Sequence, residues 1–211
     1  MFDIEYKGGN GVVLTTKKGV AVIDPRLSVV GLKDLSVKDA VVIATEERFS
    51  VKSPDMRLEI SGPGEYEVGP FAVRGVPASR HIDTPEGEKK STIYQIGVGD
   101  VRIAVLGNIT PQLSDEQMEE VGVIDILILP VGGGGYTLDA TSAASIVRQM
   151  EPKVVIPVSY ADDALKYEVP QESLEVFTQE LGAPVETVAK FKLKSAAALP
   201  ASLTVVEVTR S

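Results

Sequence analysis

The chain has 211 residues, of which 44% are hydrophobic and 24% charged, and its formal net charge is −9. These values are typical of a folded globular protein with a substantial core. The negative charge disfavours general binding to nucleic acid or to an anionic membrane surface. Disulfides, thiol catalysis and cysteine-based metal sites are excluded because there is no cysteine. The single histidine, His81, limits both zinc binding and acid–base catalysis.

No targeting or membrane segment is evident in the sequence. The opening residues, MFDIEYKGGN, lack the basic and then apolar run of a secretory signal. No segment approaches the roughly 18–20 apolar residues of a membrane span. We therefore expect a cytoplasmic protein. Since no change in composition marks a boundary, we also expect one domain over residues 1–211, with a homo-oligomer left open.

The first half of the chain predicts short strands separated by turns. Residues 11–25 predict a hairpin whose Lys-Lys-Gly turn uses Gly19 for a positive φ angle. The continuous apolar run within 39–45 predicts a buried strand. Alternating apolar residues with Gly and Pro between them predict two or three strands in 57–78 and two in 91–107.

The second half predicts alternating strands and helices. Helices are expected at 114–122, 137–150 and 170–181, and strands at 125–130, 153–160, 186–194 and 202–208. Ser114 with Gln117 three residues later predicts a capping box, and Thr137 is the expected N-cap of the second helix. This order favours a layered α/β protein whose two sheets carry helices outside.

Three local patterns suggest chemistry, and each has an ordinary structural alternative. Four glycines, 132–135, lie between a strand and a helix, where free amides bind anions or where glycine permits a tight crossing of chains. Glu65 and Glu67 are paired carboxylates for acid–base chemistry or a solvated strand face. His81, close to Asp83, is either a catalytic imidazole or an exposed loop residue.

Several segments together resemble the metallo-β-lactamase superfamily. They are, in order, GGNGVVLTTKKGVAVIDP, ISGPGEYEVGPFAVRGVPA, IDILILPVGGGGYTLDA, MEPKVVIPVSY and KFKLKSAAALP. The branch that they resemble consists of small zinc-dependent hydrolases related to the ascorbate-phosphate lactonases. The resemblance implies a four-layer αββα sandwich of two mixed β-sheets with helices outside, and a site at one edge between the sheets.

The same resemblance implies where metal ligands would lie. In that family the strand similar to VVIAT ends in Thr-His-x-His-x-Asp-His, which supplies zinc ligands and the base for the metal-bound water. Aligning Thr with Thr45 places four residues of this chain at the His, His, Asp and His positions: Glu46, Arg48, Ser50 and Val51. A shift of one residue instead places Thr45, Glu47, Phe49 and Ser50 there. The later ligands of the family match the neighbourhood of His81, and Asn108 and Ser159.

This set of residues predicts a site that has lost its zinc. Zinc needs about three or four nitrogen, sulfur or carboxylate ligands at about 2.0–2.3 Å, whereas Ser, Val and Asn are poor ligands and Arg48 adds positive charge. We therefore expect no zinc, no other cofactor and no catalytic residue in a degenerate member that binds a ligand or partner or serves as a scaffold. The alternative is a lactonase-type or phosphoesterase-type hydrolase that holds Mg²⁺ or Mn²⁺ with carboxylates from Glu46, Glu47, Asp55 or Glu65.

Two outcomes are open for the former metal cleft. Arg48 and the amides of Gly132, Gly133, Gly134 and Gly135 are candidates to bind a small anion together. Alternatively, Glu46, Glu47 or Glu65 neutralises Arg48 and the site is closed. In either case we expect six residues to lie close together: Glu46, Arg48, Ser50, His81, Asn108 and Ser159. The partner predicted for the site is a small anionic ligand or another protein.

Overall fold

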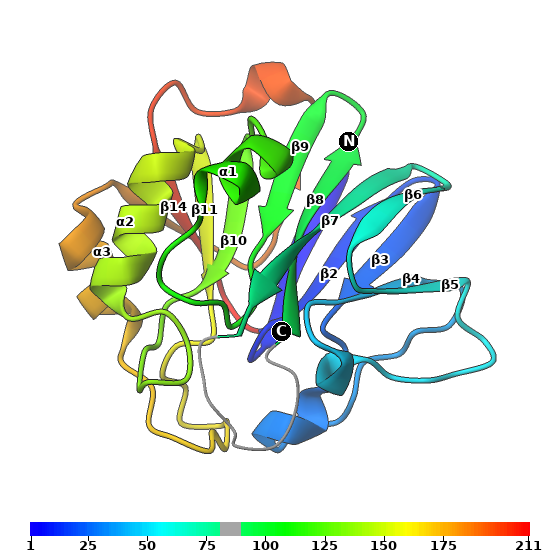
Figure 1. The fold of residues 1–211 in the computed structure, drawn as a ribbon, viewed down its shortest axis with the longest axis horizontal. Helices are drawn as coiled ribbons and strands as arrows, with labels where there is room; N and C mark the ends of the chain where they lie inside the picture. Colours follow the sequence, from blue (N-terminus) through cyan, green and yellow to red (C-terminus); the bar gives the residue numbers. More distant parts are fainter. Residues whose placement is uncertain (81–89) are drawn as a thin grey trace.

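Two β-sheets packed face to face form the centre of the computed structural model, which describes residues 1–80 and 90–211 (Figure 1). One sheet has six strands in the order β13 (Phe191–Leu193), β1 (Phe2–Gly8), β2 (Gly11–Thr16), β3 (Gly19–Ile23), β4 (Val41–Ala44), β5 (Leu58–Ser61). The other has eight, in the order β12 (Val185–Val188), β14 (Thr204–Val208), β11 (Val154–Val158), β10 (Ile126–Pro130), β9 (Val101–Val105), β8 (Lys90–Val98), β7 (Phe71–Ser79), β6 (Gly64–Val68).

Both sheets are mixed, as the sequence predicts. In the six-stranded sheet, β13, β1, β2 and β3 pair antiparallel, whereas β3, β4 and β5 pair parallel. In the eight-stranded sheet, β6, β7, β8 and β9 pair antiparallel. The neighbouring strands β9, β10, β11, β14 and β12, in this order, pair parallel. The predicted α/β class with two mixed sheets is therefore confirmed.

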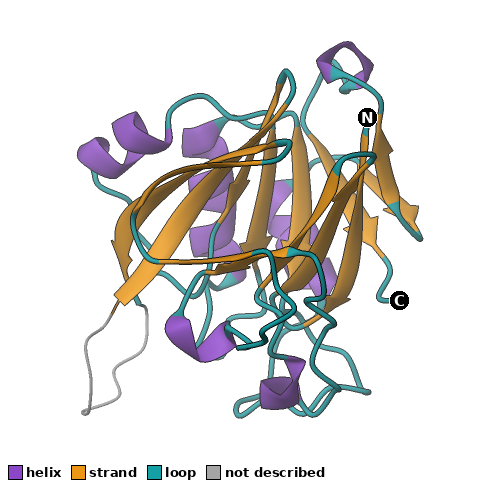
Figure 2. Cartoon of the chain, turned by 90° about the vertical axis from the view of Figure 1, so that its right-hand side faces the viewer, coloured by secondary structure: helices purple, strands orange, loops and turns teal. Residues whose placement is uncertain are grey.

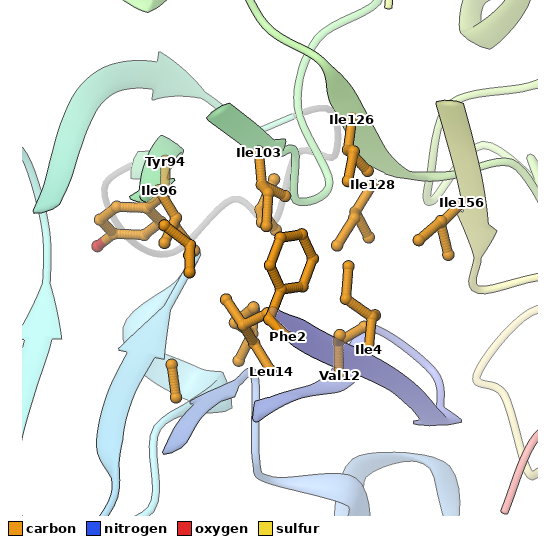
Figure 3. Packing of buried hydrophobic residues seen from close by; sticks show 14 of the residues in the cluster. Phe2, Ile4, Val12, Leu14, Tyr94, Ile96, Ile103, Ile126, Ile128 and Ile156 are labelled. Atoms are coloured by element: carbon orange, nitrogen blue, oxygen red, sulfur yellow. The ribbon is translucent and has the colours of Figure 1, made fainter. Parts of the chain in front are cut away.

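The core has two layers, because alternate residues of the strands in the eight-stranded sheet point to opposite faces of that sheet. In β10, Ile126 and Ile128 point between the two sheets, and Leu127 points to the opposite face. Figure 3 shows side chains of the six-stranded sheet, among them Ile4, facing Ile128 across the inter-sheet layer. Because both faces of the eight-stranded sheet are covered, its central strands β10 and β11 are continuous apolar runs.

Three α-helices cover the outer face of the eight-stranded sheet: α1 (Asp115–Val121), α2 (Ala140–Met150) and α3 (Leu174–Leu181). The predicted capping box is confirmed, since the Ser114 hydroxyl accepts from the Gln117 amide and the Gln117 side chain accepts from the Ser114 amide. Over the six-stranded sheet the described chain places no α-helix. Between β3 and β5 the helical segments are the 3₁₀ turns η1 (Leu27–Val30) and η2 (Glu47–Phe49). The described residues include no helix with the length and apolar character of a membrane span.

Two predicted helix starts were wrong. Helix α2 begins at Ala140 rather than at Thr137, and its N-cap is Asp139, whose carboxylate accepts from the Ser142 amide at 2.7 Å. The Thr137 hydroxyl instead donates to the Gly133 carbonyl, within the glycine loop. Helix α3 begins at Leu174, not at 170, because the residues before it are held against the same loop, where the Glu172 amide donates to the Gly132 carbonyl.

Two turn and strand predictions were also wrong. Gly19 has no positive φ angle, because the Thr16 hydroxyl closes the hairpin by accepting from the Lys18 and Gly19 amides. The strand predicted at 186–194 is divided into β12 and β13, which pair at the edges of different sheets.

Candidate functional site

The candidate site lies where parallel strands of both sheets end. Asp24 follows β3, Glu46 follows β4, Asn108 follows β9 and Ser159 follows β11. Since parallel neighbours end at the same edge, their following loops converge, and such edges are common ligand sites in α/β proteins. In Figure 2 these loops, with two short helical turns, gather at the lower end of the sheets.

A charge cluster contains three of the residues that the resemblance places at metal-ligand positions, namely Glu46, Arg48 and Asn108. The Glu46 side chain is only 3% exposed, and its carboxylate lies 2.8 Å from Arg48 Nε and 3.2 Å from Arg80 Nη1. Asn108 Nδ2 donates to the same carboxylate at 3.3 Å. We call Glu46, Arg48, Arg80 and Asn108 the charge cluster. Both carboxylate oxygens of Glu46 therefore have hydrogen-bond partners within the cluster.

Arg48 is fixed on both sides of its guanidinium. Nη1 donates to the Tyr136 hydroxyl at 2.8 Å, and the guanidinium carbon lies 4.6 Å from the Phe49 ring centroid and 5.2 Å from that of Tyr136. Burial opposes the positive charge, but Glu46 and Tyr136 outweigh burial and hold the pKa of Arg48 above its usual value. Arg48 is therefore a permanent cation in the cluster.

Asp24 is a buried carboxylate beside the cluster. It is 2% exposed, and its two oxygens accept from the Thr45 amide at 2.8 Å and the Thr45 hydroxyl at 2.6 Å. Burial raises the pKa of Asp24 to about 7, with a further rise from Glu46, although the Thr45 hydrogen bonds oppose the shift. Its φ angle of 47° is left-handed, which is uncommon outside glycine.

A pocket of about 190 Å³ opens next to the cluster. Its polar lining includes Asn10, Asp24, Arg48, Asn108, Tyr136 and Ser159. Ser159 is 5% exposed, has a left-handed φ angle of 53°, and its amide donates to the Gly9 carbonyl at 2.9 Å. The pocket is thus lined from both sheets, because Asp24 belongs to one and Asn108 and Ser159 to the other.

The structure brings together most of the residues that the sequence places at the site. Glu46, Arg48 and Asn108 are in direct contact, and Ser159 lines the pocket with Arg48 and Asn108. Ser50 does not line the pocket, because its hydroxyl is bound to the Glu59 carboxylate. His81 lies outside the described residues, so its predicted place at the site is not tested.

The glycine run serves a close crossing of chains. A Cβ at Gly132 would lie 2.3 Å from the Ser159 carbonyl oxygen, and one at Gly134 would lie 2.5 Å from that of Pro170. The Gly133 amide already donates to the Leu138 carbonyl, so it is not available to an anion. None of the four glycines lines the pocket. Anion binding by the remaining three amides stays a prediction.

Sequence reasoning missed several residues of the site. Arg80 belongs to the cluster and Tyr136 contacts it, and Asn10 and Arg26 line the pocket, but no local pattern singles out any of these four. Asp24 did carry a signal, since a carboxylate followed by Pro comes directly after the buried strand β3. Such a position at a strand end is where side chains reach an edge site.

The residues at the family's ligand positions do not fit zinc. Among the described residues at these positions in the first alignment, only Glu46 has a carboxylate, and it is bound to two arginines. Arg48, Asn108, Ser50 and Ser159 contribute a guanidinium, an amide and hydroxyls, and Val51 contributes no ligand atom. His81 lies outside the described residues. Of the carboxylates considered for another metal, Glu65 is exposed and paired with Arg74 at 2.9 Å. Across residues 1–80 and 90–211 there is no group of three or more His, Cys, Asp or Glu side chains arranged to hold a metal ion.

Comparisons with solved structures confirm the fold. A candidate Zn-dependent hydrolase of the metallo-β-lactamase superfamily from Thermotoga maritima is similar, with a TM-score of 0.74, 21% identity, and 99% of this chain and 100% of that chain covered. A candidate metal-dependent hydrolase from Parabacteroides distasonis gives 0.63, with 17% identity and coverages of 85% and 88%. Igni18, a metallo hydrolase from Ignicoccus hospitalis, gives 0.62, with 15% identity and coverages of 99% and 95%.

The sequence itself also matches a family. No curated protein matches the chain. The family model described as a β-lactamase superfamily domain matches residues 3–159, which include strands of both sheets and the four strand ends that form the site. This chain belongs to the β-lactamase superfamily.

Proposed function

We propose that this chain is a catalytically degenerate member of the superfamily that binds a small ligand or a partner without a resident zinc ion. The observation that carries the proposal is that Glu46 pairs with Arg48, both at positions where the resemblance expects metal ligands, and also with Arg80. Where a hydrolase of this family would concentrate imidazole and carboxylate ligands, this chain has two guanidinium groups. The cytoplasmic location expected from the sequence belongs to the same proposal.

Electrostatics explains why a metal would be disfavoured there. Two like unit charges 4 Å apart repel by about 4 kcal/mol at an effective dielectric constant of about 20, and a divalent cation doubles this for each arginine. A dication near Glu46 would also have to break the ion pairs that hold this buried carboxylate. Without a bound metal the pKa of water stays far above neutral, so no hydroxide nucleophile forms at neutral pH.

Metal analysis tests the proposal directly. The full chain is purified without chelator, next to a superfamily member that keeps the Thr-His-x-His-x-Asp-His motif as positive control, and both are assayed for zinc, manganese and iron. We expect well under one metal ion per chain here and near-stoichiometric metal in the control. Calorimetric titration with Zn²⁺ and Mn²⁺ should show no tight site. A stoichiometric metal in this chain would overturn the proposal.

The second candidate is a hydrolase with a carboxylate metal site, and the likeness to metal-dependent hydrolases favours it. It predicts Mn²⁺-dependent or Mg²⁺-dependent hydrolysis of lactone or phosphoester model substrates. The same experiment separates the two candidates, since this one requires both a bound metal and a rate that falls when Glu46→Gln is introduced. We favour the metal-free candidate because Glu46 is already neutralised.

A further inference from the structure

The pocket beside the charge cluster has two chemically different walls. One wall is polar and contains Asn10, Asp24, Asn108 and Ser159. The other is apolar and is formed mainly by η1, which contributes Leu27, Val29 and Val30, together with Phe49 and Val169. A volume of about 190 Å³ is below the roughly 300–1,000 Å³ of pockets for drug-sized ligands, which indicates a small ligand. A molecule with one polar end and one apolar body fits these walls.

Arg26 supplies a cation that the protein itself does not use. It immediately precedes η1, is half-buried and lines the pocket. Its backbone amide donates to the Phe49 carbonyl at 3.0 Å, but its guanidinium has no hydrogen bond or ion pair with any described residue. Arg48, the other cation of this pocket, is bound to Glu46 and Tyr136. An incoming anion would therefore find its free donors on Arg26.

Other polar groups of the pocket are also incompletely satisfied. Asn10 Oδ1 is buried without a hydrogen-bond partner, and the Tyr167 hydroxyl lies near Tyr6 and Ser159 without a hydrogen bond of standard geometry. Native proteins leave few such groups, and each unsatisfied group suggests a water or a ligand. Asp24 and Ser159, both non-glycine residues in left-handed conformations, lie in the same wall. Backbone strain of this kind concentrates at ligand sites.

The charges of the lining determine which anion fits. Glu46 already neutralises Arg48, whereas Asp24 and Glu168 present carboxylates to the same space. One unpaired guanidinium can balance a single negative charge, whereas a doubly charged phosphate would bring a second negative charge next to Glu168 and the partly ionised Asp24. We infer that this pocket binds a small organic monocarboxylate, with its carboxylate paired to Arg26 and its apolar body against Leu27, Val29 and Val30. This rests on the proposed function, because it names the ligand class of the same metal-free site.

Binding is measured by calorimetry and by ligand-observed NMR on the full chain. The probes are isovalerate and phenylacetate, their uncharged amides, and inorganic phosphate. We expect both carboxylates to bind with dissociation constants of millimolar or below and the amides and phosphate to bind at least tenfold more weakly. Arg26→Gln should weaken carboxylate binding about tenfold or more, since it removes a charge-assisted hydrogen bond. Arg57→Gln, at an exposed arginine that does not line the pocket, should leave binding unchanged.

A second pair of variants tests the site without removing Arg26. Val29 is 40% exposed in the apolar wall and Val123 is 67% exposed elsewhere, so both tolerate an aspartate without loss of core packing. Val29→Asp should abolish carboxylate binding by charge repulsion, whereas Val123→Asp should have no effect. Equal binding by wild type, Arg26→Gln and Val29→Asp, or phosphate binding in place of carboxylate, would overturn the inference. If the protein contains no metal, either of these two outcomes refutes only the carboxylate inference and leaves the proposed function intact. A stoichiometric metal would refute the proposed function independently.

Discussion

At the scale of single residues, the site contains two buried carboxylates that different kinds of partner stabilise. Glu46 requires its two arginines, because an isolated buried carboxylate would be strongly destabilising. Asp24, which follows the neighbouring strand β3, instead accepts hydrogen bonds from the Thr45 amide and hydroxyl. The two carboxylates therefore respond differently to pH and to substitution, and each response can be measured.

The raised pKa of Asp24 predicts a specific pH dependence of stability. Its ordinary value is 3.8 and its value in the fold is about 7, so the folded state holds this proton more tightly than the unfolded state. The stabilisation is complete below about pH 4 and is lost as the pH rises through about 7, at up to about 1.4 kcal/mol per pH unit. Asp24→Asn removes this dependence, and its amide can still bond to the Thr45 amide and hydroxyl.

Urea unfolding at pH 5 and pH 7 checks this prediction. The free energy of unfolding of Asp24→Asn relative to wild type should rise by roughly 2 kcal/mol between the two pH values. Carboxylates whose pKa is lowered, such as those of Glu59 and Asp162, act with the opposite sign and only as the pH falls below about 4.5, so they do not disturb this window. A difference that is the same at both pH values would show that Asp24 is not the titrating group.

The charge cluster predicts an unequal cost of two glutamate substitutions. Glu46→Gln keeps the shape of the side chain but leaves Arg48 and Arg80 without their buried counter-charge, and we expect it to lower the free energy of unfolding by about 2–3 kcal/mol. Glu65→Gln is the matched control, because its pair with Arg74 is exposed and should contribute less than about 1 kcal/mol. Equal losses in urea unfolding would contradict a structural role for the cluster.

At the scale of elements, the loop between β10 and α2 contains glycines that are required for two different physical reasons. Gly132→Ala would place a methyl group against the Ser159 carbonyl oxygen, which forces the loop or strand end to move. Gly135 has a φ angle of 73° but open space around it, so Gly135→Ala costs only the left-handed conformation, about 1–2 kcal/mol. We expect Gly132→Ala to destabilise by about 3 kcal/mol and to weaken pocket ligands because Ser159 shifts.

Thermal unfolding of the two variants measures this difference. A lower midpoint for Gly132→Ala than for Gly135→Ala is the expected order. The reverse order would mean that conformation, rather than the close crossing, determines the sequence of this loop.

Much of the element pattern was predictable because it is encoded locally. Alternation and continuous apolar runs predict the strands, and the Ser114 capping box predicts the start of α1. The starts of α2 and α3 were not predictable, since their first residues are held by contacts with the glycine loop. The same reason applies to the site. The family resemblance predicts that Glu46 and Asn108 lie close together, and they are in contact. The Glu46–Arg80 pair joins residues 34 positions apart, a separation that no local pattern encodes.

At the scale of the whole molecule, cross-sheet contacts connect the two sheets into one unit. The Tyr94 hydroxyl, from β8, donates to the Ala44 carbonyl of β4 at 3.1 Å. On the other side, the Ser159 amide after β11 donates to the Tyr6 hydroxyl of β1 at 3.3 Å. The inter-sheet core contains apolar side chains from both sheets (Figure 3). Neither sheet could keep its inner face buried without the other.

The last strands of the chain complete both sheets, so each sheet depends on residues far apart in the sequence. After α3, the chain contributes β12 to one sheet, β13 to the other, and then β14, which lies between β12 and β11. Residues 1–211 should therefore unfold as a single cooperative domain, with coincident urea transitions in far-UV circular dichroism and tyrosine fluorescence. Tyr6 and Tyr94 report on the space between the sheets, because both are fully buried there.

Removal of residues 191–211 tests the same dependence from the other direction. This deletion takes β13 from the edge of one sheet and β14 from within the other, and it uncovers Ile4 and Val154, which lie in the inter-sheet core. Since both sheets lose a strand at once, the shortened chain should show no cooperative transition rather than a weaker one. Two separate transitions in the full chain, or a cooperative transition in the shortened one, would show that the first strands fold independently of the last.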